Sequence, residues 1–447
     1  MKRFLVPALA FIFPAISFSQ NAYTLQQAVE YAQTNNIQSK NATLDIAIQQ
    51  ARVKEIRSMG LPQVNGDVSL QNFITIPTTV IPAQAFNPFA APGDILAVQF
   101  GTDYNVSASI TATQLIFDGS YFVGLKAAKE LMKMQTTMQE KTAHDIRVET
   151  MRAYYMAVVA EENIKTIEST LVNLDKLRAE TEAINKEGLI EKQDVDQFTL
   201  TVDNMRNNLQ RAKNMRDIAY QMLKLQMGLE INAEITLAQD AATLLSDSAA
   251  TAAGNIDVAK TYEHVLLDQQ LGLNELNLQN KKMKSLPSVG LFFTHQYSAM
   301  RFEFDIFENK PWYPMTVWGL KVSIPIFGSG RLSASSQQSR LESEKIRNTM
   351  KMADEGAKIQ LANATLNISF AQQNLETQKK SMELSADIEK KTLVKYKEGV
   401  IGSLELNQAQ MQYLSAQGNY IQALLNLFNA RCEMEKLRTE PVEEDKK

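Results

Sequence analysis

The segment KEGLI at residues 186–190 recurs as KEGVI at residues 397–401, an offset of 211 residues in a chain of 447. Identical residues continue beyond this segment at the same offset: Gln197 and Gln408, Asn208 and Asn419, Ala212 and Ala423, and Ala219 and Ala430. Self-similarity at a fixed spacing is the mark of a repeated structural unit. We therefore expect two copies of one supersecondary unit, each with a Lys-Glu-Gly turn in the same place.

The repeat extends upstream to shorter motifs that mark the ends of other elements. LIFDGS at 115–120 corresponds to PIFGSG at 325–330, and LPQV at 61–64 corresponds to LPSV at 286–289. Each half then reads as helix, Leu-Pro, strand, loop, strand, phenylalanine–glycine junction, long helix, Lys-Glu-Gly turn and helix. The loop between the two strands is longer in the first half.

Proline is largely confined to two windows that contain the expected strands. Nine of the twelve prolines lie at 62–92 and 287–325. Because proline breaks helix interiors, the proline-free tracts 119–185 and 330–396 are predicted to be uninterrupted helices. At about 1.5 Å per residue, each would extend roughly 100 Å. Helices of this length favour coiled-coil packing.

A heptad pattern supports coiled-coil packing. After Leu406, apolar or small residues recur with alternating spacings of three and four: Ala409, Tyr413, Ala416, Tyr420, Ala423, Leu427, Ala430, Met434 and Leu437. The first repeat keeps the same register with Val195, Phe198, Val202, Met205 and Leu209. Such a seam supercoils against a partner helix. An ordinary amphipathic helix in a globular core is the alternative for this segment taken alone.

Two segments alternate between apolar and polar residues, as a half-buried strand does. Residues 104–117 read YNVSASITATQLIF and residues 317–327 read VWGLKVSIPIF, while 64–73 and 289–298 are weaker strand candidates. The residues expected on the apolar face of the two stronger strands include Tyr104, Val106, Ile110, Trp318, Leu320 and Val322. A strand of a soluble sandwich shows the same alternation. However, four strands cannot form a sandwich that also contains two helices of roughly 100 Å.

Alternation with one apolar face is also the pattern of a membrane barrel strand. Four strands cannot close a barrel alone, whereas three copies of the chain supply twelve, an even number within the range of bacterial barrels. Closure matters because an open sheet edge is not tolerated in lipid. We therefore expect a homotrimer in which the apolar strand face contacts outer-membrane lipid.

The N-terminus, MKRFLVPALAFIFPAISFSQ, has the features of a secretory signal peptide. Lys2 and Arg3 precede an apolar run at 4–16, and residues 17–19 offer a small-x-small cleavage site. The apolar run is shorter than the roughly 20 residues that span a bilayer, which argues against a membrane anchor. No later run is long enough either, so strands would have to place the chain in a membrane.

Composition limits the classes of function. Charged residues make up 21% of the chain and the formal net charge is −4, so no nucleic-acid partner is expected. Cys432 is the only cysteine, which excludes an intrachain disulfide. The histidines, His144, His264 and His295, are scattered, and no phosphate-binding loop or nucleophile motif is present. We therefore expect a protein that is not an enzyme and has no cofactor or metal site.

The duplicated strand–strand–long-helix units, with their Leu-Pro and phenylalanine–glycine junctions, resemble the TolC-like outer-membrane efflux family. The turns strengthen the resemblance through two similar runs: Gly188-Leu189 followed by Asp194-Val195, and Tyr396 and Gly399 followed by Glu405-Leu406. The resemblance covers residues 23–438. It implies a mainly α fold with a small β part, in which a trimeric twelve-stranded outer-membrane β-barrel continues into a twelve-helix periplasmic α-barrel.

The resemblance also implies a function, that of the outer-membrane channel in a tripartite efflux system. The trimer would be a passive duct for substrates delivered by a periplasmic adaptor and an inner-membrane pump of the RND, ABC or MFS type. A long part of the protein is expected in the periplasm. One alternative is a periplasmic coiled-coil rod, which does not explain the strands. Another is a porin without a pump partner, which leaves the long helices without a purpose. The exported substrate is left open.

The Lys-Glu-Gly turns are the expected docking site for the adaptor. Gly188 and Gly399 are predicted to cap their helices in the left-handed conformation, which glycine adopts without a side-chain clash. Leu189 and Val400, exposed beside these glycines, are the predicted adaptor contacts. Single exposed apolar residues are common on protein surfaces, so the prediction depends on the occurrence of both at a helix end.

A gate is expected at the same end of the molecule, formed by Asp194, Glu405, Tyr396 and Gln408. Glu405 would recur three times around a narrow axis and form a cation-favouring ring. A role in stabilising the helix dipole, by roughly 0.3–1 kcal/mol, is the alternative for Asp194. Gln408 replaces the acid that the family commonly has one helical turn later, and Ile401 stands where some members have an arginine.

These observations divide the chain into five segments: a signal peptide at 1–19, a first structural repeat at 20–228, an equatorial linker at 229–256, a second repeat at 257–438 and a charged tail at 439–447. The resemblance implies that the linker and the residues after 432 form a belt around the helical tunnel.

Overall fold

The computed structural model describes residues 22–246 and 256–438, and it divides into two compact units. A helical unit comprises residues 22–45, 136–246, 256–266 and 350–438, and a sheet unit comprises residues 46–135 and 267–349. The predicted signal peptide and charged tail lie outside the described residues, as does the part of the equatorial linker at 247–255.

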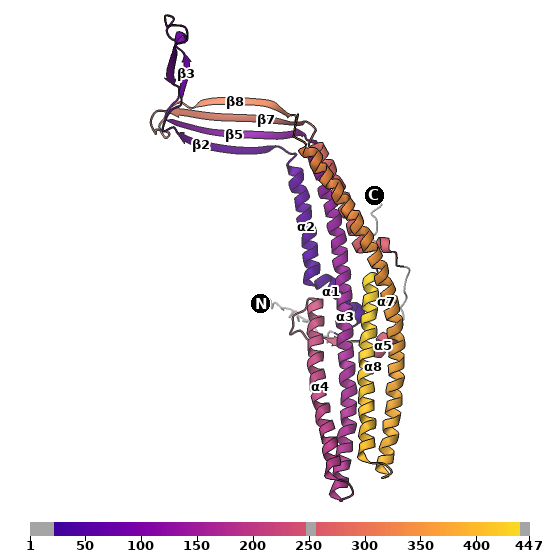
Figure 1. Ribbon diagram of the computed structural model, residues 1–447. Coiled ribbons are helices and arrows are strands. Elements are labelled where there is room, and N and C mark those ends of the chain that lie inside the picture. The colour runs from indigo at the N-terminus through magenta and orange to yellow at the C-terminus, as the bar shows by residue number, and fades with distance from the viewer. Residues whose placement is uncertain (1–21, 247–255, 439–447) are drawn as a thin grey trace, which may run out of the picture. The chain divides into compact units, whose positions relative to one another are not determined.

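The sheet unit contains a four-stranded antiparallel sheet, in the order β2-β5-β7-β8 (Figure 1). Its strands are β2 (Gln63–Asn72), β5 (Tyr104–Phe117), β7 (Ser288–Arg301) and β8 (Tyr313–Ser323). All four predicted strands are confirmed, but the prediction for the last, 317–327, was wrong by four residues at each end. The strand ends at Ser323, two residues before Pro325, which has no N–H to donate to the ladder.

The first inter-strand loop, 74–103, contains a second small sheet that the sequence analysis did not predict. Strand β3 (Thr78–Pro82) pairs with β4 (Ile95–Gln99), and a short helix, η1 (Ala83–Ala85), follows β3. Pro82 is tolerated because β3 belongs to a two-stranded sheet and is therefore an edge strand. The longer loop of the first repeat is therefore a hairpin.

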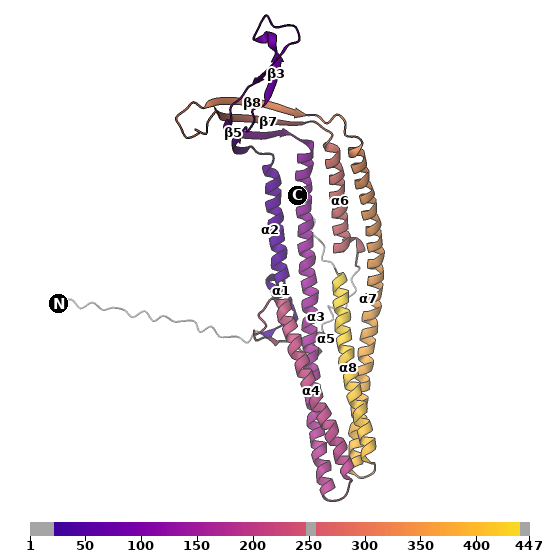
Figure 2. The same ribbon diagram turned by 60° about the vertical axis from the view of Figure 1, so that its left-hand side comes forward.

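Helices adjoin the sheet at both repeats. They are the sheet-unit parts of α2 (Ile37–Ser58), α3 (Gly119–Lys186), α6 (Tyr262–Met283) and α7 (Arg331–Lys397). Figure 2 shows α6 and α7 side by side. Asn274 Nδ2 on α6 donates hydrogen bonds to the Ser339 carbonyl and to Ser343 Oγ on α7, both at 2.8 Å. These bonds fix the two helices against each other.

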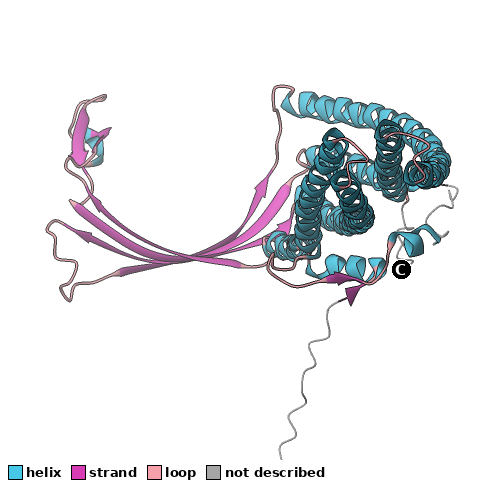
Figure 3. Ribbon diagram, turned by 90° about the horizontal axis from the view of Figure 1, so that it is seen from below, coloured by secondary structure: helices cyan, strands magenta, loops and turns pink. Residues whose placement is uncertain are grey.

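The helical unit is built from two helical hairpins, seen end-on in Figure 3. In one hairpin, α3 is followed by the antiparallel helix α4 (Lys192–Met227), and in the other, α7 is followed by α8 (Ser403–Leu437). Both predicted long helices, α3 and α7, are thereby confirmed. The shorter elements are α1 (Leu25–Asn35), α5 (Ala241–Ser246), η3 (Val258–Lys260) and a parallel pair of strands, β1 (Ala22–Tyr23) and β6 (Thr236–Leu237). Within the described ranges, no helix combines the length and hydropathy needed to cross a membrane.

The core of the helical unit follows the predicted heptad seam. From Leu406 to Met434, each predicted seam residue of α8 is buried or half-buried. In the core, Phe428 stacks on Tyr155 of α3 with ring centroids 4.3 Å apart. Arg431 Nη1 donates to the Leu244 carbonyl at 2.7 Å and so attaches α5 to α8. The described part of the predicted equatorial linker is therefore packed on the hairpins.

Candidate functional site

Both Lys-Glu-Gly turns adopt the same capping geometry. The φ angle is +75° at Gly188 and +71° at Gly399, in the left-handed region. The residue after each glycine donates its N–H to the carbonyl five residues earlier, at 3.3 Å in the first turn and 2.9 Å in the second. These are the bonds of a Schellman motif, which satisfies the last carbonyls of a helix. The glycines thus end α3 and α7 as expected.

The two turns are held next to each other at one end of the helical unit. The hydroxyl of Ser403, at the start of α8, donates a hydrogen bond to Asp194 Oδ1, in the first turn of α4. Lys397 Nζ in the last turn of α7 lies 2.6 Å from Glu180 Oε2 on α3. The paired turns are the lower end of the helices in Figure 1. We call these two turns, residues 186–190 and 397–401, the tip.

The tip presents apolar side chains to the surroundings. Leu189 is 77% exposed and Val400 is 68% exposed. Each residue directly follows the capping glycine and therefore lies outside the helix that the glycine ends. Nothing in the described chain covers them. The structure therefore brings together the four residues that the sequence analysis assigned to docking.

The predicted gate residues lie in different surroundings. Glu405 and Gln408 are exposed on the first turns of α8, whereas Asp194 is half-buried and bonded to Ser403. Asp194 therefore links the two turns of its own chain. Glu405 is in the first turn of a helix, where its carboxylate also complements the helix dipole.

Tyr396, in the last turn of α7, is half-buried near the tip. Its ring meets that of Phe198 edge-on, at 6.3 Å between centroids, in a cluster with Leu177 and Leu406. Burial, together with the charge of Asp194, raises the pKa of the Tyr396 phenol. The side chain is therefore neutral at physiological pH and contributes its hydrophobic surface to the packing of the four helices.

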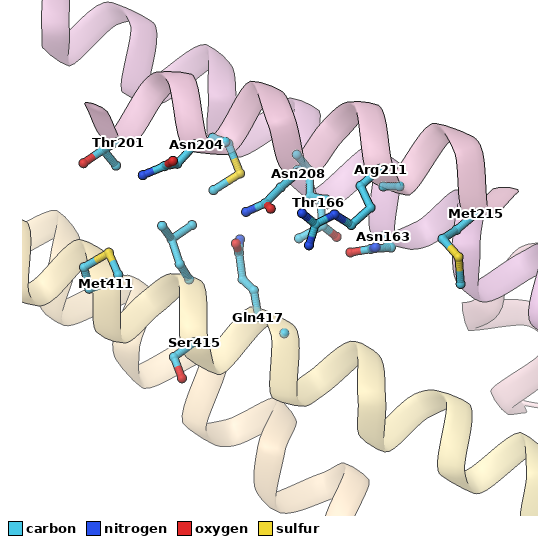
Figure 4. A pocket seen from close by; sticks show the side chains of 15 residues that line it. Asn163, Thr166, Thr201, Asn204, Asn208, Arg211, Met215, Met411, Ser415 and Gln417 are labelled. Carbon is cyan, nitrogen blue, oxygen red and sulfur yellow. The ribbon is translucent and has the colours of Figure 1, made fainter. Parts of the chain in front are cut away.

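A pocket of 530 Å³ lies between α3, α4 and α8, further along the helices from the tip (Figure 4). Its lining is rich in amides: Asn163, Asn204, Asn208 and Gln417. In Figure 4, Asn208 and Gln417 point toward each other across the gap between α4 and α8. Gln417 Nε2 donates to Thr170 Oγ1 at 3.0 Å, so one amide of the pocket also joins α8 to α3.

Sequence reasoning missed this polar contact between the hairpins, although a signal was present. Gln410, Gln417, Leu424 and Arg431 recur every seven residues and are all buried. They form a second stripe on α8, one residue beyond the predicted apolar seam. A search for apolar heptads overlooks it because three of its four members are polar.

The β-sheet separates apolar from polar residues on its two faces. Cross-strand partners point to the same face of a sheet, and the register aligns Ala112 with Phe293 and Phe293 with Trp318. The opposite face carries hydroxyls that bond across strands, Ser69 with Ser107 at 2.7 Å and Thr111 with Thr294 at 3.2 Å. The predicted apolar residues of β5 and β8 therefore share one face.

Most of the residues predicted to face lipid are accessible. Ile110, Trp318, Leu320 and Val322 are exposed, and Tyr104 is half-buried beside Phe304. Val106 differs, because it is only 8% exposed in the single chain. It is thus already packed within the chain, and its contact with any outside partner is small.

The structure offers little for catalysis or metal binding. Among residues 22–246 and 256–438, no group of three or more histidine, cysteine or acidic side chains is arranged to hold a metal ion. Burial raises the pKa of the Cys432 thiol to about 12. Because the thiolate is the reactive and metal-binding form, Cys432 is a packing residue at neutral pH.

Comparison with known proteins identifies relatives of both sequence and fold. Residues 276–437 match the family model described as outer membrane efflux protein. The fold matches the CmeC outer membrane channel of Campylobacter jejuni with a TM-score of 0.71 at 14% identity, covering 98% of this chain and 93% of that one. It matches the open MtrE outer membrane channel of Neisseria gonorrhoeae with a TM-score of 0.70 at 16% identity, covering 92% and 88%. No curated protein sequence matches the chain.

Proposed function

We propose that this chain, whose residues 276–437 match the outer membrane efflux protein family, is the passive outer-membrane duct of a tripartite export system. An efflux channel role and an outer-membrane location follow from the family itself. The family consists of channels, so the prediction that the protein is not an enzyme is confirmed.

The observation that carries the proposal is that the four-stranded sheet has two open edges and an exposed apolar face. Strands β2 and β8 are its two edges, and each pairs with only one other strand in the described chain. One face of the sheet is apolar and exposed. An apolar face suits lipid, but open edges do not, because their unpaired N–H and C=O groups have no partner in hydrocarbon. The chain therefore needs further strands at both edges.

Three copies of the chain supply those strands. If β8 of one copy pairs with β2 of the next, twelve strands close into a barrel with no edge. The polar face, with its bonded hydroxyls, then lines the lumen, and Ile110, Trp318 and Leu320 face lipid. In the same trimer, four long helices per chain make a twelve-helix periplasmic tunnel.

The tip is proposed to dock a periplasmic adaptor. Leu189 and Val400 are exposed apolar residues beside rigid left-handed caps, an arrangement that gives a partner a preformed contact at small entropic cost. The adaptor would connect the duct to an inner-membrane pump of the RND, ABC or MFS type. The chain has no nucleotide-binding motif of its own, so the pump must supply the energy.

A single pair of substitutions tests the duct against a porin or a rod. Val400→Asp places a charge on the tip, whereas Val172→Asp makes the same change at an equally exposed valine, 69% against 68%, on α3 and 14 residues before that helix ends at Lys186. We expect the Val400→Asp strain to lose resistance to exported compounds while trimer on a blot stays normal. The Val172→Asp strain should keep its resistance.

Two outcomes would count against docking at the tip. Wild-type resistance in the Val400→Asp strain would show that the turns are not the contact, and it would favour the porin. Equal loss of resistance in both strains with normal trimer would show that the effect is not specific to the tip.

A further inference from the structure

A basic cavity lies in the sheet unit where α6 ends and α7 begins. It has a volume of 450 Å³, and its lining includes Lys281, Lys284, Arg331, Ile326 and Phe327. The connection from β8 to α7, which Figure 2 shows as a ribbon, contributes Ile326, Phe327 and Gly328 to the lining. None of these residues belongs to the tip or to the two faces of the sheet.

The positive charge of this cavity is not balanced by ion pairs. Among the described residues, none of the three cations has a carboxylate within salt-bridge distance. Lys281 Nζ donates to neutral oxygens, the Ser335 carbonyl at 3.0 Å and Ser339 Oγ at 2.7 Å, so its charge is held in place but not neutralised. The hydrogen bond from Ser120 is the main cause that lowers the pKa of the Asp118 carboxyl, and the positive charge of Lys284 lowers this pKa further.

Apolar side chains of the same lining are unusually open to the surroundings. In the single chain, Ile326 is 94% exposed and Phe327 is 87% exposed. They lie just beyond Ser323, the last residue of β8. A cavity that combines three cations outside any ion pair with exposed aliphatic and aromatic groups matches a ligand that is anionic at one end and apolar at the other.

The internal repeat provides a comparison within the molecule. On the alignment of LIFDGS with PIFGSG, Asp118 corresponds to Gly328. In the first repeat, the Asp118 carboxylate accepts from the Ser120 N–H at 2.7 Å and from its hydroxyl at the same distance. In the second repeat, Gly328 lines the cavity and offers no carboxylate. The second junction therefore supplies no carboxylate of its own at this position, and the Asp118 carboxylate whose charge reaches Lys284 belongs to the first junction.

We propose that this cavity binds the phosphate-bearing headgroup of an anionic phospholipid, with Ile326 and Phe327 against its acyl chains. Arginine and lysine are the usual phosphate ligands, and basic pockets beside membrane segments select anionic headgroups. A free phosphate shares the headgroup chemistry, but it does not account for the exposed apolar wall. The inference rests on the proposed function, because it takes the apolar sheet face to lie in the outer membrane.

The test is lipid retention, measured by native mass spectrometry of the purified full chain in detergent with phosphatidylglycerol or phosphatidylcholine added. Wild type should retain phosphatidylglycerol in preference to phosphatidylcholine, and inorganic phosphate should not displace it at equal concentration. Gly328→Asp supplies the carboxylate of the first repeat and should weaken phosphatidylglycerol retention by about tenfold, the equivalent of one charge-assisted contact. Lys284→Gln combined with Arg331→Gln should do the same.

Gly328→Ala is the matched control, because a Cβ at this position meets nothing within 4 Å. Equal retention of the two lipids by wild type, or equal retention by the Asp and Ala variants, would overturn the inference. Displacement by inorganic phosphate would show a free-anion site instead. Bound lipid is counted per chain and the oligomer is read from the same spectrum. A trimer without selective lipid contradicts only this site, and a monomer that keeps selective lipid contradicts only the proposed trimer.

Discussion

Single side chains at the tip have unequal parts in the proposed function. Asp194 is joined to Ser403 within one chain, whereas Glu405 is exposed on the first turn of α8. In a trimer, Glu405 would recur around the axis, and Asp194 would hold the two turns of each chain together. The two carboxylates that the sequence analysis grouped are therefore expected to respond differently to neutralisation.

Glu405→Gln should lower the cation preference of the channel and leave the trimer intact. The lost helix-dipole interaction costs only roughly 0.3–1 kcal/mol, whereas a threefold carboxylate ring would lose its entire charge. Single-channel recordings in a salt gradient measure the preference through the reversal potential. Glu398→Gln, which removes the same charge from the turn itself, is the control. An unchanged reversal potential in Glu405→Gln would mean that this residue does not line the path.

The hydrogen bond between Gln417 and Thr170 should couple the two hairpins. Both residues are buried, so Gln417→Ala is expected to lower the free energy of unfolding by about 1–3 kcal/mol. Thr170→Val removes the other partner with little change of shape. A denaturation series on wild type, the two single variants and the double variant gives the coupling energy. Strictly additive losses would show that the bond does not connect the hairpins energetically.

At the scale of the strand, the two faces of β5 should differ in their tolerance of charge. Ile110→Arg places a cation on the exposed apolar face and should cost about 2–4 kcal/mol near the middle of a membrane. Ser109→Arg, at the adjacent residue, places it on the polar face. The yield of folded trimer in the outer membrane measures the difference. Equal yields would show that the apolar face does not contact lipid. Val106 is unsuitable for this test, because it is already buried in the single chain.

The sequence predicts best those elements whose cause is local. Both long helices begin and end within one or two residues of their predicted limits, because proline is absent inside them and a glycine cap closes each one. Strand β5 was predicted in full from its alternation. These signals arise from neighbouring residues and need no knowledge of the remaining fold.

Elements that depend on distant contacts were predicted less well. The limits of β8 are set by its pairing with β7. Strand β8 begins at Tyr313 because this residue pairs with Ser298, although Pro314 follows inside the strand. The hairpin of β3 and β4 was hidden by the prolines of its loop. The buried stripe of Gln410 and Gln417 depends on packing against a helix some 250 residues away along the chain, as the separation of 247 between Thr170 and Gln417 shows. Polar residues in such a stripe resemble a solvated face until the partner helix is known.

At the scale of the whole molecule, the proposal connects two incomplete surfaces. The sheet unit has an apolar face and two open edges, and the helical unit has an exposed apolar tip. Assembly with two further copies would satisfy the edges, and an adaptor would cover the tip. A rod-like structural protein has no need of the sheet, and a porin has no need of the tip.

The central claim is that the four strands of one chain form one third of a closed twelve-stranded barrel. Light scattering of the purified protein, corrected for bound detergent, measures the protein mass of the folded particle directly. The account predicts three times the mass of one mature chain, with strand content retained in the circular dichroism spectrum. A stable monomer or dimer that keeps this strand content would contradict it, because neither can close the two edges of the sheet.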